Sequence, residues 1–240
     1  MARESLEEKK HRAADIIAAL KKRYPDVKCA LNHSNAYELL VATILSAQCT
    51  DVRVNMVTPV LFKKYPAPEA LANASQVDVE TIIRTTGFFR SKAKSIRESA
   101  ADIVLKHGGK VPQNMHELTA LRGVGRKTAN VVLGNAFNQN VGVVVDTHVN
   151  RLSNRLALTT HKDPAKIEQD LMKLIPQPQW TLFSHLLIHH GRQICTARNP
   201  KCNSCPILNT CPTGPKLIAA ANSLASHRKA PNARASHGGA

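Results

Sequence analysis

The chain has 240 residues, of which 43% are hydrophobic and 4% aromatic, a composition typical of a soluble globular protein that does not bind through rows of stacked rings. Its apolar runs are shorter than the roughly 20 residues of a membrane span, and its N-terminus lacks the apolar core of a secretion signal. We therefore expect a cytoplasmic protein with no membrane partner. The net charge of +16 favours a polyanionic partner, most simply nucleic acid. Residues 171–240 contain no Asp or Glu, which predicts that this region faces phosphates.

Helical periodicity extends through nearly the whole chain. Residues 6–24 predict a helix that stops before Pro25. Its apolar face consists of Leu6, Ala13, Ile16, Ile17 and Leu20. Apolar residues three and four apart predict further helices at 36–47, 52–64, 79–86, 91–107, 149–156 and 165–174. The only strand-like run, residues 141–145, is short, so the sequence predicts an all-α protein.

Two glycines separate a pair of short helices around the segment LRGVGRKTANVVL, residues 121–133. Asn114 and Glu117 predict a capped start for the first helix. Gly123 and Gly125 permit a tight turn with positive φ and the close approach of another backbone. The N–H groups of the turn and the positive end of the second helix suit a phosphate. Two glycines alone, however, favour an ordinary packing corner between helices.

Two residues near this turn carry groups that could do chemistry. Lys127 lies in the first turn of the second helix, whose positive end disfavours an ammonium and so favours a nucleophilic amine. Asp146 ends the apolar run VGVVVD and precedes a predicted helix, where an aspartate is typical of an N-cap. Taken alone, Lys127 fits a solvated phosphate contact and Asp146 fits only the cap.

Four of the six cysteines lie in the segment CTARNPKCNSCPILNTC, residues 195–211. Zinc sites made of four thiolates usually contain two C-x2-C pairs, and here there is one, formed by Cys202 and Cys205. Four thiolates suit a [4Fe–4S] cluster, so the spacing favours iron–sulfur over zinc. A disulfide framework is not expected in a reducing compartment. Cys29 and Cys49 lie apart in apolar stretches and are expected to fill core space.

Several segments together resemble the helix–hairpin–helix DNA glycosylases, and within them the endonuclease III family. They are LSAQCTD at 45–51, GFFRSKAKSI at 87–96, LRGVGRKTANVVLGNAF at 121–137, VDTHVNRLSNRL at 145–156 and HHGRQIC at 189–195. With the cysteine spacing, the likeness extends from about residue 37 to residue 211. The hairpin and aspartate elements are shared by the whole superfamily, and the four-cysteine pattern narrows the resemblance to the cluster-bearing branch.

The resemblance implies a fold of two all-α lobes with a DNA cleft between them. Residues 29–139 would form a six-helix domain with the hairpin motif. Residues 1–28 and 140–212 would form the iron–sulfur cluster domain, and residues 213–240 a basic flexible tail.

The implied function is that of a bifunctional DNA glycosylase and abasic-site lyase of base excision repair. Such an enzyme, expected as a nucleoid-associated monomer, would remove oxidised pyrimidines from duplex DNA through a lysine Schiff base and β-elimination. The alternatives are a pyrimidine-dimer or mismatched thymine/uracil glycosylase, and a non-catalytic DNA-binding module.

The resemblance also implies roles for single residues. Lys127 stands at the position of the family's catalytic lysine, and Asp146 at that of the carboxylate that stabilises the cationic sugar. Gln48 matches the residue that enters the space left by the extruded base, and Phe88 matches a wedge position often held by leucine. The expected ligands of the [4Fe–4S] cluster are Cys195, Cys202, Cys205 and Cys211. The other expected DNA contacts are Gly123, Gly125, Arg126, His148, Arg151, Arg198 and Lys201, of which His148 and Arg151 also fit structural roles.

Two positions depart from the family's pattern. Arg122 stands where the hairpin usually has proline, which gives a freer turn with one more positive charge. Asn199 stands where members often carry a cation, so we expect one weaker phosphate contact. Arg198 and Lys201 lie in a short loop whose two ends would be fixed by the cluster. The loop would therefore be ordered before it binds a phosphate, and binding would cost less conformational entropy.

Overall fold

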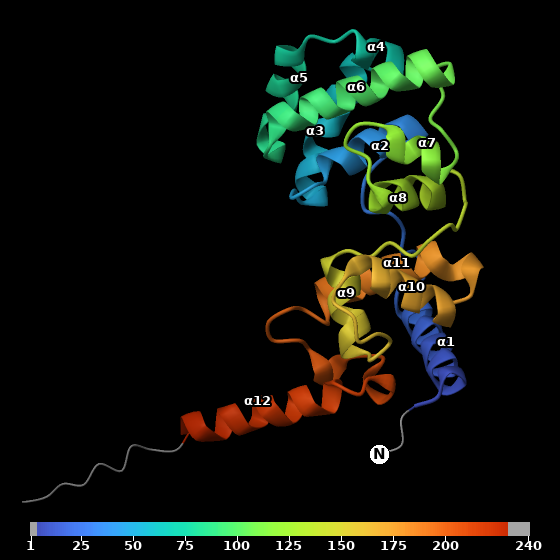
Figure 1. Ribbon diagram of the computed structural model, residues 1–240. Coiled ribbons are helices and arrows are strands. Elements are labelled where there is room, and N and C mark those ends of the chain that lie inside the picture. The colour runs from blue at the N-terminus through green and yellow to red at the C-terminus, as the bar shows by residue number, and fades with distance from the viewer. Residues whose placement is uncertain (1–3, 230–240) are drawn as a thin grey trace, which may run out of the picture.

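The computed structural model describes residues 4–229, and every regular element in that range is a helix (Figure 1). The upper lobe in the figure consists of α2 (Ala36–Leu45), α3 (Asp51–Lys64), α4 (Pro68–Ala72), α5 (Gln76–Ile83), η1 (Arg84–Thr86), α6 (Phe89–His107), α7 (Met115–Ala120) and α8 (Arg126–Ala136). The lower lobe consists of α1 (Leu6–Arg23), α9 (Thr147–Arg155), α10 (Pro164–Leu174), η2 (Gln177–Gln179), α11 (Trp180–Gln193), η3 (Cys202–Ser204), η4 (Leu208–Thr210) and α12 (Gly214–Lys229). The predicted all-α class is confirmed. None of the described helices is long and apolar enough to span a membrane.

Each lobe has a hydrophobic core of its own. The upper core surrounds α2, which is buried on nearly all sides because apolar side chains occupy almost every position of the helix. The lower core joins α1, from the start of the chain, to α9, α10 and α11. The chain therefore begins in the lower lobe, crosses to the upper one and returns. We retain residues 29 and 139 as proposed domain boundaries between these cores.

Local signals account for where individual helices begin. The Ser5 hydroxyl accepts the backbone N–H of Glu8 at 3.2 Å, and the Glu8 carboxylate accepts the N–H of Ser5 at 2.7 Å. This capping box starts α1, and the helix ends at Arg23, just before the predicted stop. The Asn114 side chain accepts the N–H of Glu117 at 2.9 Å and starts α7 as predicted.

The structure corrects two predicted features of local packing. Leu6 is 55% exposed rather than part of the buried face of α1, because it is the first residue of that helix and precedes the first buried position, Ala13. Residues 141–145 form no strand, since no partner strand exists in the described part of the chain. The backbone N–H of Val144 donates instead to the Ser184 hydroxyl at 3.0 Å.

Two further findings concern helices. The upper lobe has seven α-helices, one more than the resemblance implied, and the shortest of them is the five-residue α4. Within the proposed tail, where residues 217–224 also fitted a short helix, the chain forms α12, whose alanine-rich sequence has high helix propensity. The rest of that predicted tail, residues 230–240, lies outside the described residues.

Candidate active site and cysteine cluster

The hairpin between α7 and α8 packs against α6 at its first glycine and has open space at its second. Gly123 has φ 78°, and a Cβ there would lie 3.0 Å from Cβ of Ser95 in α6, so a side chain would be strained by the backbone conformation and crowded by Ser95. Gly125 is the N-cap of α8, and a Cβ there would meet no atom within 4 Å. No side chain caps α8 by a hydrogen bond. The first N–H groups of α8 therefore lack a side-chain cap and can receive an anion.

The hairpin keeps its shape although Arg122 replaces the expected proline. The Ser99 hydroxyl donates to the Arg122 carbonyl oxygen at 2.6 Å. The Arg122 guanidinium pairs with Glu98 at 2.9 Å. Contacts with α6 thus hold the turn in place of a proline ring.

Lys127 and Asp146 line one pocket of about 140 Å³ between the lobes. Lys127 is the second residue of α8 and is exposed. Asp146 is half-buried and caps α9, with Oδ1 accepting the N–H of Val149 at 2.8 Å. The predicted N-cap is confirmed, and it holds the carboxylate at the pocket wall. Lys28 is a second lysine that lines this pocket.

A polar pair from the two lobes forms another part of the pocket wall. Nε2 of His185, in α11, lies 2.7 Å from Oδ1 of Asn135, in α8. Burial lowers the pKa of His185 to about 4, so the ring is neutral and donates from Nε2. Nδ2 of Asn135 donates to the carbonyl oxygen of Val131 at 2.8 Å, which fixes the amide. Periodicity in the sequence gave no signal for this contact.

The lowered pKa of His185 makes stability depend on pH. An unfolded chain protonates this ring near its ordinary pKa of about 6.5, whereas the folded chain does so near 4. The unfolded state therefore binds more protons between these values, and stability rises with pH across that window. We expect His185→Gln to flatten the fall in Tm between about pH 6.5 and pH 4, an effect of at most about 3 kcal/mol. The exposed His11→Gln is the control, and equal pH slopes for wild type and His185→Gln would contradict the expectation.

Gln48 and Phe88 are exposed at the ends of upper-lobe helices in a strained conformation. Gln48 follows α2 with φ 51°, and Phe88 precedes α6 with φ 46°. Phe88 is 67% exposed, which excludes a role as a core aromatic. A left-handed conformation costs a side chain of this size about 1–3 kcal/mol and persists where the surroundings impose it, often at functional sites.

The predicted DNA contacts near the cleft are engaged in internal contacts. The Arg126 guanidinium binds the Glu168 carboxylate with Nε–Oε2 at 2.8 Å, and this hydrogen bond raises the pKa of Arg126. Arg151 donates to the carbonyl oxygens of Gly191 and Cys195 at 2.9 and 3.0 Å. His148 lies 3.2 Å from Arg151, and burial lowers its pKa. Arg151 therefore ties α9 to the end of α11.

The loop between Cys195 and Cys202 presents its two cations to solvent. Arg198 and Lys201 are both exposed. The Thr196 hydroxyl donates to the Arg198 carbonyl oxygen at 2.6 Å and closes the loop on itself. Asn199 has φ 49°, a conformation that asparagine tolerates better than most residues. This local geometry gives Asn199 a structural reason to stand where a cation was expected.

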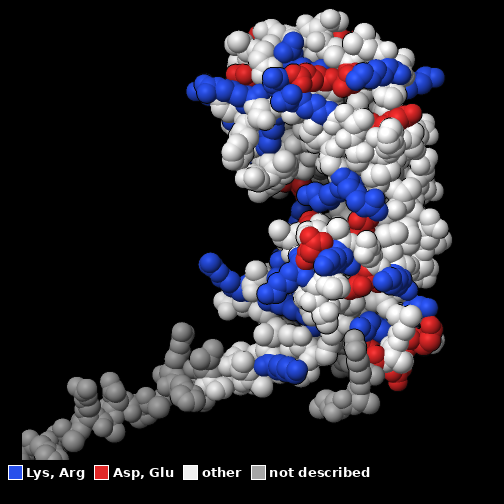
Figure 2. Space-filling model, viewed as in Figure 1, with Lys and Arg blue, Asp and Glu red and all other residues white. Residues whose placement is uncertain are grey.

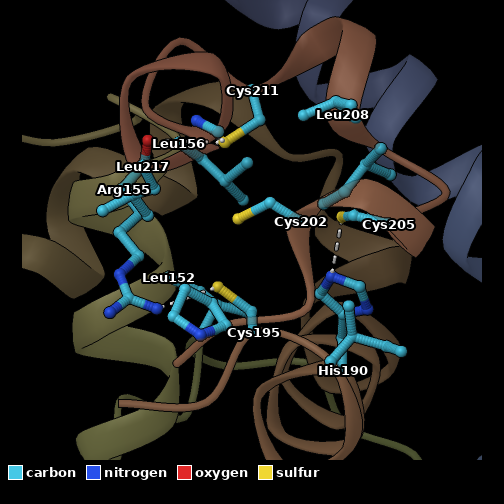
Figure 3. A pocket seen from close by; sticks show the side chains of 14 residues that line it. Leu152, Arg155, Leu156, His190, Cys195, Cys202, Cys205, Leu208, Cys211 and Leu217 are labelled. Atoms are coloured by element: carbon cyan, nitrogen blue, oxygen red, sulfur yellow. Dashed lines mark hydrogen bonds between the residues drawn. The ribbon is translucent and has the colours of Figure 1, made fainter. Parts of the chain in front are cut away.

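The four clustered cysteines surround one apolar pocket (Figure 3). Cys195 follows α11, Cys202 and Cys205 lie at η3, and Cys211 follows η4. The other lining residues are mostly apolar and include Leu152, Leu156, Ile194, Ile207 and Leu217. No three His, Cys, Asp or Glu side chains of the described residues converge as they would on a single ion. Four sulfurs spread around a pocket suit a multi-iron cluster better than one zinc ion.

N–H donors point at three of the four sulfurs. Arg155 lies 3.3 Å from the Cys195 sulfur, and the N–H of Gly214 lies 3.3 Å from that of Cys211. His190 lies 3.4 Å from the Cys205 sulfur, and its other ring nitrogen accepts from the Tyr24 hydroxyl at 3.0 Å. Donors of this kind stabilise the negative charge of thiolate ligands. The residues present therefore fit a thiolate-bound cluster, which would hold the loop's cations in place.

Removing one of these thiols gives a direct check of the site. We expect Cys202→Ser to lose roughly half or more of its iron, together with its visible absorption, and to melt at a lower temperature, because metal binding is linked to folding of the loop. Cys49→Ser removes a thiol that packs against the upper core instead, and should retain both iron and spectrum. Full iron content in Cys202→Ser would show that the cluster has other ligands.

The surface is indented between the lobes, and Lys and Arg side chains lie above and below the indentation (Figure 2). The indentation lies on the side of the molecule where the lobes part in the ribbon view. A recess with positive charge on both rims attracts a polyanion.

Comparison with known proteins defines the class to which this fold belongs. Residues 41–177 match the family model of the HhH-GPD superfamily base excision DNA repair proteins. Residues 195–211 match the iron–sulfur binding domain of endonuclease III. The chain is thus a helix–hairpin–helix repair glycosylase of the iron–sulfur branch.

Within that class, the chain belongs to the endonuclease III family. It is 55% identical over 205 residues to endonuclease III of Synechocystis sp., which covers 85% of this chain and 94% of the relative. A non-covalent endonuclease III–DNA complex has a TM-score of 0.83 at 42% identity and covers 88% of this chain and 98% of its own. A trapped endonuclease III–DNA covalent intermediate has a TM-score of 0.82 at 42% identity, covering 87% and 98%. The predicted family, fold, iron–sulfur cofactor and enzyme class, a DNA glycosylase and abasic-site lyase, are confirmed.

Proposed function

We propose that this enzyme excises oxidised pyrimidines from duplex DNA and cuts the strand at the resulting abasic site, with Lys127 as nucleophile and Asp146 as its carboxylate partner. The observation that carries the proposal is that these two residues, one from each lobe, line the same pocket. A relative at 42% identity was solved as a trapped covalent intermediate with DNA, which supports a covalent step here.

The first stage is displacement of the damaged base. The neutral amine of Lys127 attacks the anomeric carbon of the sugar, and a C–N bond forms while the glycosidic bond breaks. The base leaves with the bonding electrons and takes up a proton. Positive charge develops on the sugar as the bond breaks, and the Asp146 carboxylate stabilises it. Because the α9 cap already orients this carboxylate, little reorganisation accompanies the reaction.

The second stage is strand cleavage. The attached amine loses a proton and the sugar ring opens, which leaves a Schiff base between Lys127 and the former anomeric carbon. Loss of a proton from the neighbouring sugar carbon then expels the 3′ phosphate by β-elimination. Water hydrolyses the imine and restores the amine. Asp146 can accept and return protons at the Lys127 nitrogen during these steps.

Duplex DNA would lie across the indentation between the lobes, as a relative solved in complex with DNA suggests. A phosphate would bind the uncapped N–H groups of α8 at Gly125, and others would meet Arg198 and Lys201. Gln48 and Phe88 would enter the stack as the damaged nucleotide leaves it. The two lobes of one chain supply all of these groups, so the enzyme would act as a monomer.

A panel of duplexes distinguishes the proposed lesions from the alternatives. We expect excision of thymine glycol and dihydrouracil to be faster than excision of mismatched uracil or a pyrimidine dimer. Preference for the mismatch or the dimer would favour the corresponding glycosylase instead. Absence of turnover on every duplex, with DNA binding retained, would identify a non-catalytic binding module.

A further inference from the structure

One buried carboxylate of the lower lobe holds the helix that carries the nucleophile. Glu168, in α10, is only 6% exposed. Its Oε2 accepts from Nε of Arg126 at 2.8 Å, and its Oε1 accepts from Nη2 of Arg126 at 3.0 Å and from Nδ2 of Asn130 at 2.9 Å. Both donors belong to α8 in the upper lobe, so a single side chain joins the lobes through three hydrogen bonds.

The residues of α8 that bind Glu168 lie on one face of the helix, beside the face that lines the pocket. Arg126, Asn130 and Gly134 are four residues apart and share one face of the helix. At Gly134 a Cβ would collide with the Thr181 hydroxyl of α11, so this face packs closely on the lower lobe. The adjacent stripe, shifted by one residue, consists of Lys127, Val131 and Asn135, all of which line the pocket.

The chain between the lobes also closes on this carboxylate. A Cβ at Gly142 would collide with Oε1 of Glu168 and lie 2.6 Å from Nδ2 of Asn130. Gly142 lies four residues before Asp146. The segment that leads from α8 to Asp146 therefore packs directly against the contact between Glu168 and α8.

We propose that Glu168 is a positioning residue, which fixes the rotation and depth of α8 against the lower lobe and thereby sets Lys127 relative to Asp146. The inference rests on the proposed function of those two residues. The hydrogen bonds from Arg126 and Asn130 lie beside Lys127, so their loss frees the lysine end of α8 from the lower lobe. A displacement of about 1 Å at a reacting group can lower a rate about 100-fold. Arg198 and Lys201, which are proposed to meet phosphates, lie outside this contact.

The test compares three variants in single-turnover reactions at saturating enzyme: Glu168→Gln, Arg126→Gln and the double variant. We expect Glu168→Gln to release base and form the borohydride-trapped adduct about 10- to 100-fold more slowly than wild type. Its affinity for a duplex carrying a reduced abasic site should stay within about twofold. Glu7→Gln removes the same charge from an exposed site on α1 and is the matched control.

The Arg126 variants separate positioning from DNA contact, and they keep the test decisive if Glu168→Gln does not fold, because Arg126 is half exposed. If both residues act through one contact, the double variant is no slower than the slower single variant. If Arg126 instead contacts a phosphate directly, Arg126→Gln should bind DNA more weakly, and the salt dependence of its binding should have a slope smaller by about one. The losses of the two single variants would then multiply in the double variant. A direct phosphate contact of this kind would overturn the inference. So would a wild-type rate in Glu168→Gln, or a loss of rate in that variant no larger than its loss of DNA affinity. Absence of a wild-type adduct would overturn the proposed function, and this inference with it.

Discussion

Lys127→Ala should abolish the covalent adduct that forms when the enzyme, abasic-site DNA and borohydride are mixed. The Schiff base needs a primary amine, and alanine supplies none, so we expect strand cleavage to fall at least about 1,000-fold. Alanine is a good helix former, and Lys127 is exposed, so α8 should fold normally. Affinity for the same DNA should fall only slightly, because the substitution removes a single surface charge.

The control for this experiment is Lys166→Ala, which removes an exposed lysine from α10 on the lower lobe. That variant should form the adduct at the wild-type rate. An undiminished adduct in Lys127→Ala would assign the nucleophile to another amine, and Lys28 in the same pocket is the first to consider.

Asp146→Asn should slow base release about 100-fold or more while affinity for DNA changes little. Asparagine is as good an N-cap as aspartate, so the hydrogen bond from Val149 is retained and α9 starts as before. Only the negative charge is removed, and that charge stabilises the sugar most when the glycosidic bond is breaking. Single-turnover release of thymine glycol, measured beside binding of a reduced abasic site, separates the two effects.

Asp146→Ser is the matched variant, because serine also caps a helix but carries no charge. It should be as slow as Asp146→Asn. If both variants instead lost rate and affinity in equal proportion, Asp146 would serve only to fold α9.

Short-range signals in the sequence were sufficient for much of the fold. The caps at Asn114 and Asp146 were predicted from short segments, and both are present in the structure. α11 gave no such signal. Three histidines interrupt its apolar pattern, yet His190 is buried because it bonds Tyr24 and faces a cysteine sulfur from another segment. Only tertiary contacts make such a polar residue suitable for a core.

In the candidate site, too, some residues could be predicted from the sequence, whereas others depend on contacts between distant segments. The resemblance to the family pointed to Lys127 and Asp146, and the spacing of the four cysteines favoured an iron–sulfur cluster. The pairing of Arg126 with Glu168 joins residues 42 positions apart in different lobes, and no local pattern encodes it. The resemblance implied a DNA contact at Arg126 and gave no sign that its guanidinium binds the Glu168 carboxylate.

Peptide mapping of the borohydride-reduced adduct tests most directly whether Lys127 is the nucleophile. Wild-type enzyme is trapped on abasic-site DNA, both components are digested, and the modified peptide is sequenced by mass spectrometry. We expect the sugar remnant on Lys127 and on no other residue. A remnant on Lys28, or on any amine outside the pocket, would contradict the assignment.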